Sequence, residues 1–223
     1  MHSESTFMTL SSYPPKPFRE TRRDVLIETM ETLRLGLLVT TCDVEELSAV
    51  HVPMLVKQAG EKLFLDCHVG VANPIWRQAA GRKALVVFQG PHAYVHPGWY
   101  ATKKQTGKVV PTWNYISVQA RGVVETVRDE ARLRAHVDVL SQAMEQGRAD
   151  PWAITDAPAD YMETMLEGIV GLRMEVTDLR GVWKMSQNHP EGNRVGAIDG
   201  LASGSHADQD VAVVMRGREA DRK

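Results

Sequence analysis

The sequence predicts a mainly β protein of the α+β class, with an antiparallel barrel at its centre and accessory helices. Short apolar runs that suit strands follow one another with few helices between them, at residues 37–41, 49–56, 62–67, 84–88, 116–127, 170–176 and 182–185. Two of these runs, 116–127 and 170–176, alternate in the way of a strand with one buried face. This arrangement favours an antiparallel barrel over a parallel α/β sheet, in which helices alternate regularly with strands.

The expected helices have recognisable starts and ends. Thr21, followed three positions later by Asp24, gives a start close to the capping-box pattern, and Gly36 ends this first helix. Two longer helices are expected at 129–146 and 156–167, where apolar residues recur every three or four positions. The first of these three helices is expected to cover an opening of the barrel.

One folded domain, residues 13–201, is expected between two flexible ends. Residues 1–12 form a leader, and the prolines that follow at 14, 15 and 17 favour extended structure. Residues 202–223 lose the apolar pattern and are expected to form a flexible tail.

Composition restricts the class of protein. The chain has 223 residues and a net charge of −2, so it shows no whole-chain basic character of the kind that nucleic-acid-binding domains carry. Cys42 and Cys67 lie far apart and outside any zinc-binding spacing, which indicates reduced core cysteines. The first residues lack the basic start and apolar run of a secretory signal. We therefore expect a cytoplasmic protein.

A strand–loop–helix unit at residues 64–81 suits the binding of an anion. Asn73 is a favoured N-cap, Pro74 a favoured first helical residue, and Gly81 a favoured residue just past a helix end. A helix start presents unpaired N–H groups and the positive end of a dipole, both of which favour a phosphate. The alternative is a plain helix cap beside a buried histidine.

Two further segments have residues that suit a planar ligand with polar edges. Trp113 offers a ring face, and Asn114 offers both a donor and an acceptor. The run KMSQN (184–188) follows Trp183 and supplies Lys, Ser and Gln side chains for a phosphate or a polar edge. The alternatives are a strand that enters the core with two aromatic residues, and an exposed polar turn.

Common catalytic and metal-binding signatures do not occur. The sequence contains no GxGxxG, P-loop or GxSxG pattern, so no catalytic residue is assigned. His92 and His96 have a spacing that binds metal on a helix, but Pro91 and Pro97 oppose a helix there. No metal site is expected.

Seven motifs in this order resemble the PaiB family, FMN-binding negative transcriptional regulators built on the FMN-binding split barrel. They are KPFRE (16–20), HVPMLV (51–56), HVGVANPIW (68–76), FQGPHAYVHPGWY (88–100), KVVPTWNY (108–115), GIVGLRMEV (168–176) and KMSQN (184–188). The resemblance implies a split β-barrel that binds FMN near the interface of a homodimer.

The resemblance also implies roles for individual residues. The FMN phosphate is expected at His68, Val69, Ala72 and Asn73, with help from Lys184. The isoalloxazine is expected at Trp113 and Asn114, while Ser186 and Gln187 complete the site, Gln187 across the dimer. One departure is that the phosphate loop contains no Arg or Lys, the nearest being Arg77.

Three functions are compatible with this resemblance. The first is a flavin-dependent negative regulator of transcription, and because no helix-turn-helix signature is present, its action is expected to be indirect. The second is a small FMN-dependent reductase or oxidase. The third is a split barrel that binds or degrades haem, with His92 or His96 as axial ligand. The sequence names neither a substrate nor a promoter.

Overall fold

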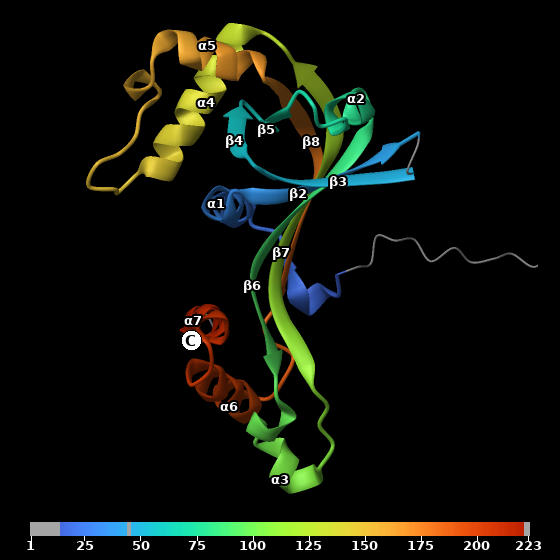
Figure 1. Cartoon of the computed structure of the whole chain (residues 1–223). Coiled ribbons are helices and arrows are strands. Elements are labelled where there is room, and N and C mark those ends of the chain that lie inside the picture. The colour runs from blue at the N-terminus through green and yellow to red at the C-terminus, as the bar shows by residue number, and fades with distance from the viewer. Residues whose placement is uncertain (1–13, 44–45, 221–223) are drawn as a thin grey trace, which may run out of the picture. The chain divides into compact units, whose positions relative to one another are not determined.

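The computed structural model describes residues 14–43 and 46–220. Its strands form one sheet in the order β3-β2-β6-β7-β8-β5-β4, and β1 pairs with β8. The strands are β1 (Arg19–Glu20), β2 (Leu35–Cys42), β3 (Glu46–Pro53), β4 (Leu55–Ala59), β5 (Lys62–Gly70), β6 (Lys83–Val95), β7 (Thr112–Val127) and β8 (Ile169–Lys184) (Figure 1). This confirms the expected mainly β architecture with accessory helices. The expected leader, residues 1–12, lies outside the described residues.

The helices are α1 (Arg23–Leu33), α2 (Ile75–Ala79), α3 (Thr102–Thr106), α4 (Glu130–Glu145), α5 (Ala159–Glu167), α6 (Glu191–Ala202) and α7 (His206–Ala220). Short 3-10 turns occur at Lys16–Phe18, Pro97–Trp99 and Ile154–Asp156. None of the helices in the described part of the chain is long and apolar enough to cross a membrane.

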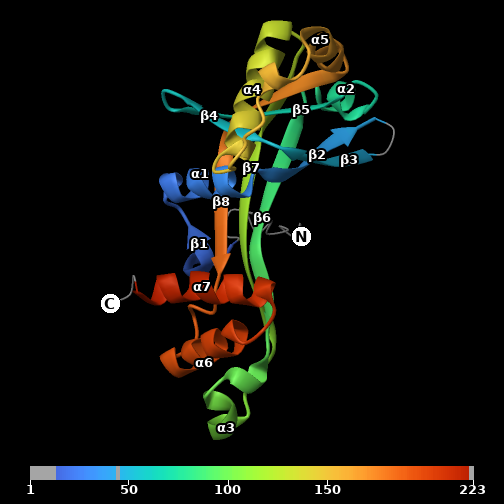
Figure 2. The same cartoon turned by 60° about the vertical axis from the view of Figure 1, so that its left-hand side comes forward.

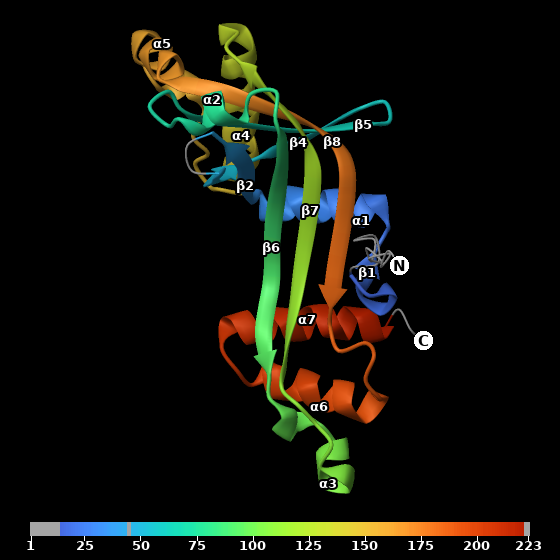
Figure 3. The same cartoon turned by 90° about the vertical axis from the view of Figure 1, so that its right-hand side faces the viewer.

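The chain divides into two compact units. Among the described residues, the large unit comprises 23–43, 46–89 and 118–180, and the small unit comprises 14–22, 90–117 and 181–220. Strands β6, β7 and β8 are long enough to contribute residues to both units (Figure 3). The two strands predicted at 170–176 and 182–185 belong to one continuous strand, β8. The polar residues between them do not interrupt it.

The large unit has its core inside the curved sheet. On β5, Leu63, Leu65, Cys67 and Val69 are buried, and alternation along a strand places Asp66 and His68 on the opposite face. Helix α4 begins as predicted, with the Asp129 side chain accepting a hydrogen bond from the Arg132 N–H. At Gly171 on β8 a side chain would press against Leu133 of α4, so this glycine lets helix and strand approach closely.

The small unit packs α6 and α7 against the parts of β6, β7 and β8 that belong to it (Figure 2). Residues 206–220 form α7, so most of the predicted flexible tail is helical, and its Val211, Ala212 and Met215 are buried. Helix α6 was not predicted either, because it contains several glycines and glycine is a poor helix former. A side chain at Gly196 or Gly200 would overlap Trp99, so close packing explains both residues.

Strand β6 changes the phase of its alternation at the boundary between the units. Ala84, Val86, Phe88 and Gly90 are buried at every second position. After Pro91 and His92 the buried positions become Ala93 and Val95, and Tyr94 is exposed. The buried side chains therefore change from one face of the strand to the other at this point, so each part of the strand buries its own apolar residues.

Candidate functional site

The loop after β5 has the predicted local structure but uses several of its own N–H groups. The Val71 N–H donates to the Gly168 carbonyl (2.8 Å) and the Asn73 N–H to the Gly70 carbonyl (2.9 Å). The Asn73 Oδ1 accepts from the Ile75 N–H (3.0 Å), as expected of a residue at a helix start. Helix α2 has only five residues. Because little donor capacity and a weak dipole remain, an anion at this loop needs charged side chains nearby.

Two arginines supply that charge. The Trp76 Nε1–H donates to the Val71 carbonyl (3.0 Å), which fixes its indole ring against the loop. The Arg77 guanidinium lies 4.1 Å and the Arg128 guanidinium 4.9 Å from the Trp76 ring centre, both at cation–π distance. Both arginines are exposed, and neither forms an ion pair with another residue in the described part of the chain. The sequence analysis named Arg77 as the basic residue nearest the loop. It missed Arg128, which is far from the loop in sequence.

His68 is half-buried and pairs with a buried histidine that the sequence did not single out. Its Nδ1 lies 3.0 Å from Nε2 of His136 on α4, so one ring donates to the other. Burial lowers the pKa of His68, and burial together with the neighbouring His68 lowers the pKa of His136 to about 4. Both rings are therefore neutral near pH 7. The Nδ1 of His136 is buried and has no partner among the described residues.

A partly buried ion-pair cluster lies on the same face of β5. The Arg173 guanidinium binds both oxygens of Asp66, each at 2.7 Å, and the Lys57 ammonium lies 3.2 Å from Oδ2. Burial alone would raise the pKa of Asp66, but the hydrogen bonds and charges of Arg173 and Lys57 outweigh it and lower this pKa. The carboxylate is thus ionised and held in one orientation.

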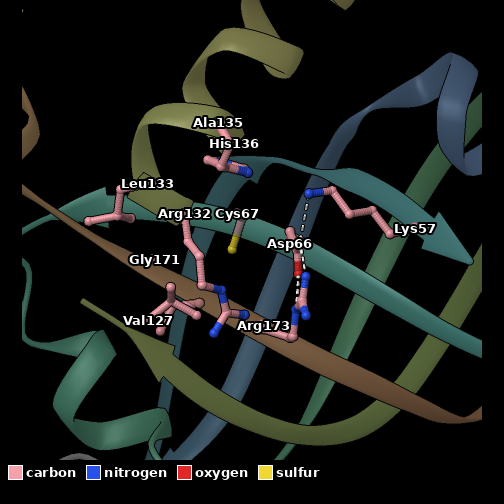
Figure 4. A pocket seen from close by; sticks show the side chains of 11 residues that line it. Lys57, Asp66, Cys67, Val127, Arg132, Leu133, Ala135, His136, Gly171 and Arg173 are labelled. Atoms are coloured by element: carbon pink, nitrogen blue, oxygen red, sulfur yellow. Dashed lines mark hydrogen bonds and ion pairs between the residues drawn. The ribbon is translucent and has the colours of Figure 1, made fainter. Parts of the chain in front are cut away.

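These groups line a pocket of about 250 Å³ in the large unit, between α4 and strands β4, β5 and β8 (Figure 4). The polar and charged lining residues are Lys57, Asp66, Cys67, Arg132, His136 and Arg173. The Arg132 side chain extends from α4 toward Gly171, and the Asp66–Arg173 ion pair lies beside it. Within the described residues, no group of three metal-ligating side chains occurs.

In the small unit, Asn114 and Ser186 are brought together, but in the interior. Asn114 is fully buried, its Oδ1 accepts from the Ser186 hydroxyl (3.0 Å), and its Nδ2 lies 3.2 Å from the Met215 sulfur of α7. Ser186 is buried as well and has a left-handed backbone, with φ of 57°. Direct contact of Asn114 with a flavin would require it to leave these partners.

Trp113 has the opposite environment. Its side chain is 54% exposed, and the rings of His92 and Tyr94 lie 6.4 and 6.1 Å away. Lys184 is half-buried and donates to the hydroxyl of Thr112, the residue before Trp113. An exposed aromatic surface of this kind can stack on a flat ring.

Gln187 is held by its own chain. Its Oε1 accepts from the Met185 N–H (2.6 Å), and its Nε2 donates to the carbonyls of Pro17 (2.9 Å) and Trp183. These bonds attach the Lys16–Phe18 turn to the end of β8. The predicted contact of Gln187 with a partner subunit stays a prediction.

The nine predicted site residues therefore fall into two groups. His68, Val69, Ala72 and Asn73 belong to the large unit, and Trp113, Asn114, Lys184, Ser186 and Gln187 belong to the small unit. Within each unit, neighbours are brought close to one another. Their individual roles toward a cofactor stay predictions.

Residues 12–178 match a family described as "Putative FMN-binding domain". The chain belongs to this family. It is also 30% identical to the protease synthase and sporulation protein PAI 2 of Bacillus subtilis over 85% of this chain and 88% of that protein. An uncharacterized protein of Emericella nidulans is 37% identical over 61% of this chain and 59% of its own length. The resemblance to the PaiB family drawn from the motifs is confirmed.

Solved structures agree on the fold. The flavocytochrome Anf3 of Azotobacter vinelandii superimposes with a TM-score of 0.53 at 11% identity, over 80% of this chain and 75% of that chain. The conserved hypothetical protein Rv2991 of Mycobacterium tuberculosis gives a TM-score of 0.52 at 12% identity, over 79% and 92%. The predicted split-barrel fold is confirmed, and family membership supports a flavin cofactor.

Proposed function

We propose that the protein binds FMN and acts as a flavin-responsive negative regulator of the PaiB type. Membership in the FMN-binding family over residues 12–178 is the observation that carries the proposal. Cys42 and Cys67 are buried thiols, which is consistent with a place in the cytoplasm, where thiols stay reduced.

For the FMN phosphate we propose the loop of Val69, Ala72 and Asn73 together with the arginines that flank Trp76. The loop N–H groups of Val71 and Asn73 are used within the chain, so the guanidiniums of Arg77 and Arg128 are the strongest donors at hand. Arginine binds phosphate through paired N–H groups, and each charge-assisted hydrogen bond contributes about 1.5–3 kcal/mol. Lys184 and the exposed Trp113 stay candidates for a second phosphate contact and for ring stacking.

A flavin titration tests this assignment. We expect the protein to quench FMN fluorescence saturably, with one FMN bound per subunit. The double variant R77Q/R128Q should bind FMN at least ten-fold more weakly. Riboflavin lacks the phosphate, so its affinity should be the same for wild type and variant. R134Q controls for the loss of an arginine away from the loop, because Arg134 lies on α4 and pairs with Glu130. Equal loss of FMN and riboflavin affinity, or no loss of either, would refute the phosphate assignment.

We also propose that two copies associate through the large unit. A groove of about 580 Å³ lies over β2, β3, β6, β7 and β8. Its lining includes the exposed aliphatic side chains of Leu47 (64% exposed) and Val123 (41% exposed), beside Lys83, Arg121 and Asp178. Such a surface favours a protein partner, and the proposed partner is a second copy of this chain. Light scattering should give a dimer for wild type and a monomer for L47E. A wild-type monomer would exclude this association.

Regulation by this protein is proposed to be indirect. Helices α6 and α7 are joined by a short turn, but two of their three arginines are paired, Arg194 with Glu219 and Arg218 with Glu20. With a net charge of −2 as well, the helix pair offers little free positive charge to a phosphate backbone. The purified protein should therefore leave promoter fragments unshifted at physiological salt, and a salt-sensitive shift would show direct DNA binding.

A further inference from the structure

The pocket beneath α4 carries positive charge that the chain does not balance. Its charged lining residues are Lys57, Arg132, Arg173 and Asp66, and Asp66 is the sole carboxylate among them. Asp66 is already bound by Arg173 and Lys57. Arg132 forms no ion pair within the described residues, although its backbone N–H caps α4 at Asp129. An anion entering the pocket would meet a free guanidinium.

His136 adds an unused hydrogen-bonding atom. The residue is only 6% exposed and is among those that line the pocket, and its Nδ1 lacks any partner among residues 14–43 and 46–220. A buried polar atom left unpaired costs about 1–3 kcal/mol, so such an atom calls for an explanation. If His68 donates its Nδ1–H to Nε2 of His136, then the neutral His136 carries its proton on Nδ1. The histidine pair thus allows a donor to an anion at that atom.

The remaining lining is apolar and sets the size of the ligand. Val127, Leu133 and Leu172 border the same space as Arg132 and His136. Its volume, about 250 Å³, lies below the 300–1,000 Å³ typical of sites for drug-sized ligands. A flavin is too large for this pocket, whereas a compact molecule with one charged end fits.

We propose that this pocket binds a small organic oxyanion, a carboxylate or phosphate ester with a compact apolar body. Arg132 pairs with the oxyanion, the Nδ1–H of His136 donates to it, and Val127 and Leu133 contact the body. The Asp66–Arg173–Lys57 cluster holds the floor of the pocket in place. His136 is also hydrogen-bonded to His68, a predicted flavin-site residue. The histidine pair would therefore link the ligand to that residue.

Titration with benzoate and with phenyl phosphate tests the proposal and separates the two head groups. The readout is the ring 15N signal of His136 in the intact protein. We expect one of the two probes to shift the Nδ1 signal saturably, with R132Q weakening its affinity at least ten-fold and R134Q leaving it unchanged. Since Arg132 is exposed, R132Q should fold normally, and its thermal unfolding checks this.

Three outcomes would overturn the proposal. They are no saturable shift with either probe, equal affinity of wild type and R132Q, and competitive displacement of the probe by FMN. The last outcome would mean that the pocket belongs to the flavin site. A second variant, H136N, should keep the fold and weaken the same probe, whereas unchanged affinity would remove His136 from the site. FMN binding by R132Q should equal that of wild type, so failure of this proposal is distinguishable from failure of flavin binding.

Discussion

Two buried polar side chains, Asn114 in the small unit and His136 in the large unit, differ in how fully they are hydrogen-bonded. In the small unit, both polar groups of the Asn114 side chain have partners, from Ser186 and Met215. In the large unit, His136 is also buried but keeps an unpaired nitrogen, and Arg132 beside it has no counterion among the described residues. Paired buried groups help to specify a fold, whereas an unpaired buried group calls for an explanation, and for His136 we propose a ligand.

The largest expected effect concerns the ion-pair cluster of the large unit. D66A removes the carboxylate that binds Arg173 and Lys57, and it should lower the free energy of unfolding by about 2–3 kcal/mol. This is less than the 3–5 kcal/mol of a fully buried pair, because the Arg173 side chain is 27% exposed. Chemical denaturation measures the loss. K62A, which breaks an exposed pair with Glu175, should change stability by less than about 1 kcal/mol. Equal losses of stability in D66A and K62A would show that the Asp66 cluster contributes no more than an exposed ion pair.

A smaller effect is expected for the paired amide of the small unit. N114A leaves the Ser186 hydroxyl without its buried acceptor and should cost about 2 kcal/mol. A double-mutant cycle with S186A isolates the bond from other effects of each substitution. We expect a coupling energy of about 1 kcal/mol, and a value near zero would contradict a structural role for this pair.

Acid should weaken both units through one carboxylate in each. In the small unit, the side-chain hydrogen bond from Arg22 lowers the pKa of Glu20 to about 2, although burial opposes it. A lowered folded-state pKa stabilises the protein above the ordinary pKa, near 4.5, and this stabilisation is lost as the pH falls toward 2. Asp66 acts in the same direction, with its loss below its ordinary pKa of 3.8. Unfolding followed from pH 5 to pH 2 should show a shallower decline for E20Q than for wild type, and parallel curves would exclude Glu20.

The smallest effect is expected where a buried group is unpaired. H136L removes the unpaired Nδ1 and keeps an apolar side chain in its place, so stability should change by less than about 1 kcal/mol in either direction. His68 loses its partner but is only half-buried. A loss as large as that of N114A would show that His136 supports the fold rather than a ligand.

Much of the architecture was predictable because local patterns agree with the final packing. The helical spacing of apolar residues in α4 and the alternation in β7 appear in the sequence and recur in the structure. Helix α7 was missed because its buried stripe is short and lies among charged residues. Helix α6 was missed because its glycines are explained by Trp99, a contact that no local pattern shows.

The candidate site was only partly predictable for the same reason. The loop at Asn73 has a local signature, and it forms as expected. The arginine at 128 and the histidine at 136 meet that region through contacts 52 and 68 residues apart in sequence, which neither spacing nor composition reveals. Asn114 and Gln187 have the chemistry of ligand contacts, yet the structure occupies them with internal hydrogen bonds.

Because the buried face of β6 changes partway along the strand, the number of residues in β6 determines which side chains are buried. Between Phe88 and Ala93 the interval between buried positions gains one residue, so the two parts of the strand are out of step by one. Deleting a single residue there would turn Ala93 and Val95 toward solvent and Tyr94 inward, while most substitutions at His92 would preserve both faces. Natural variation at this point should thus appear as changes of identity rather than of length, and a gap placed here in an alignment of relatives would signal a different arrangement of the strand.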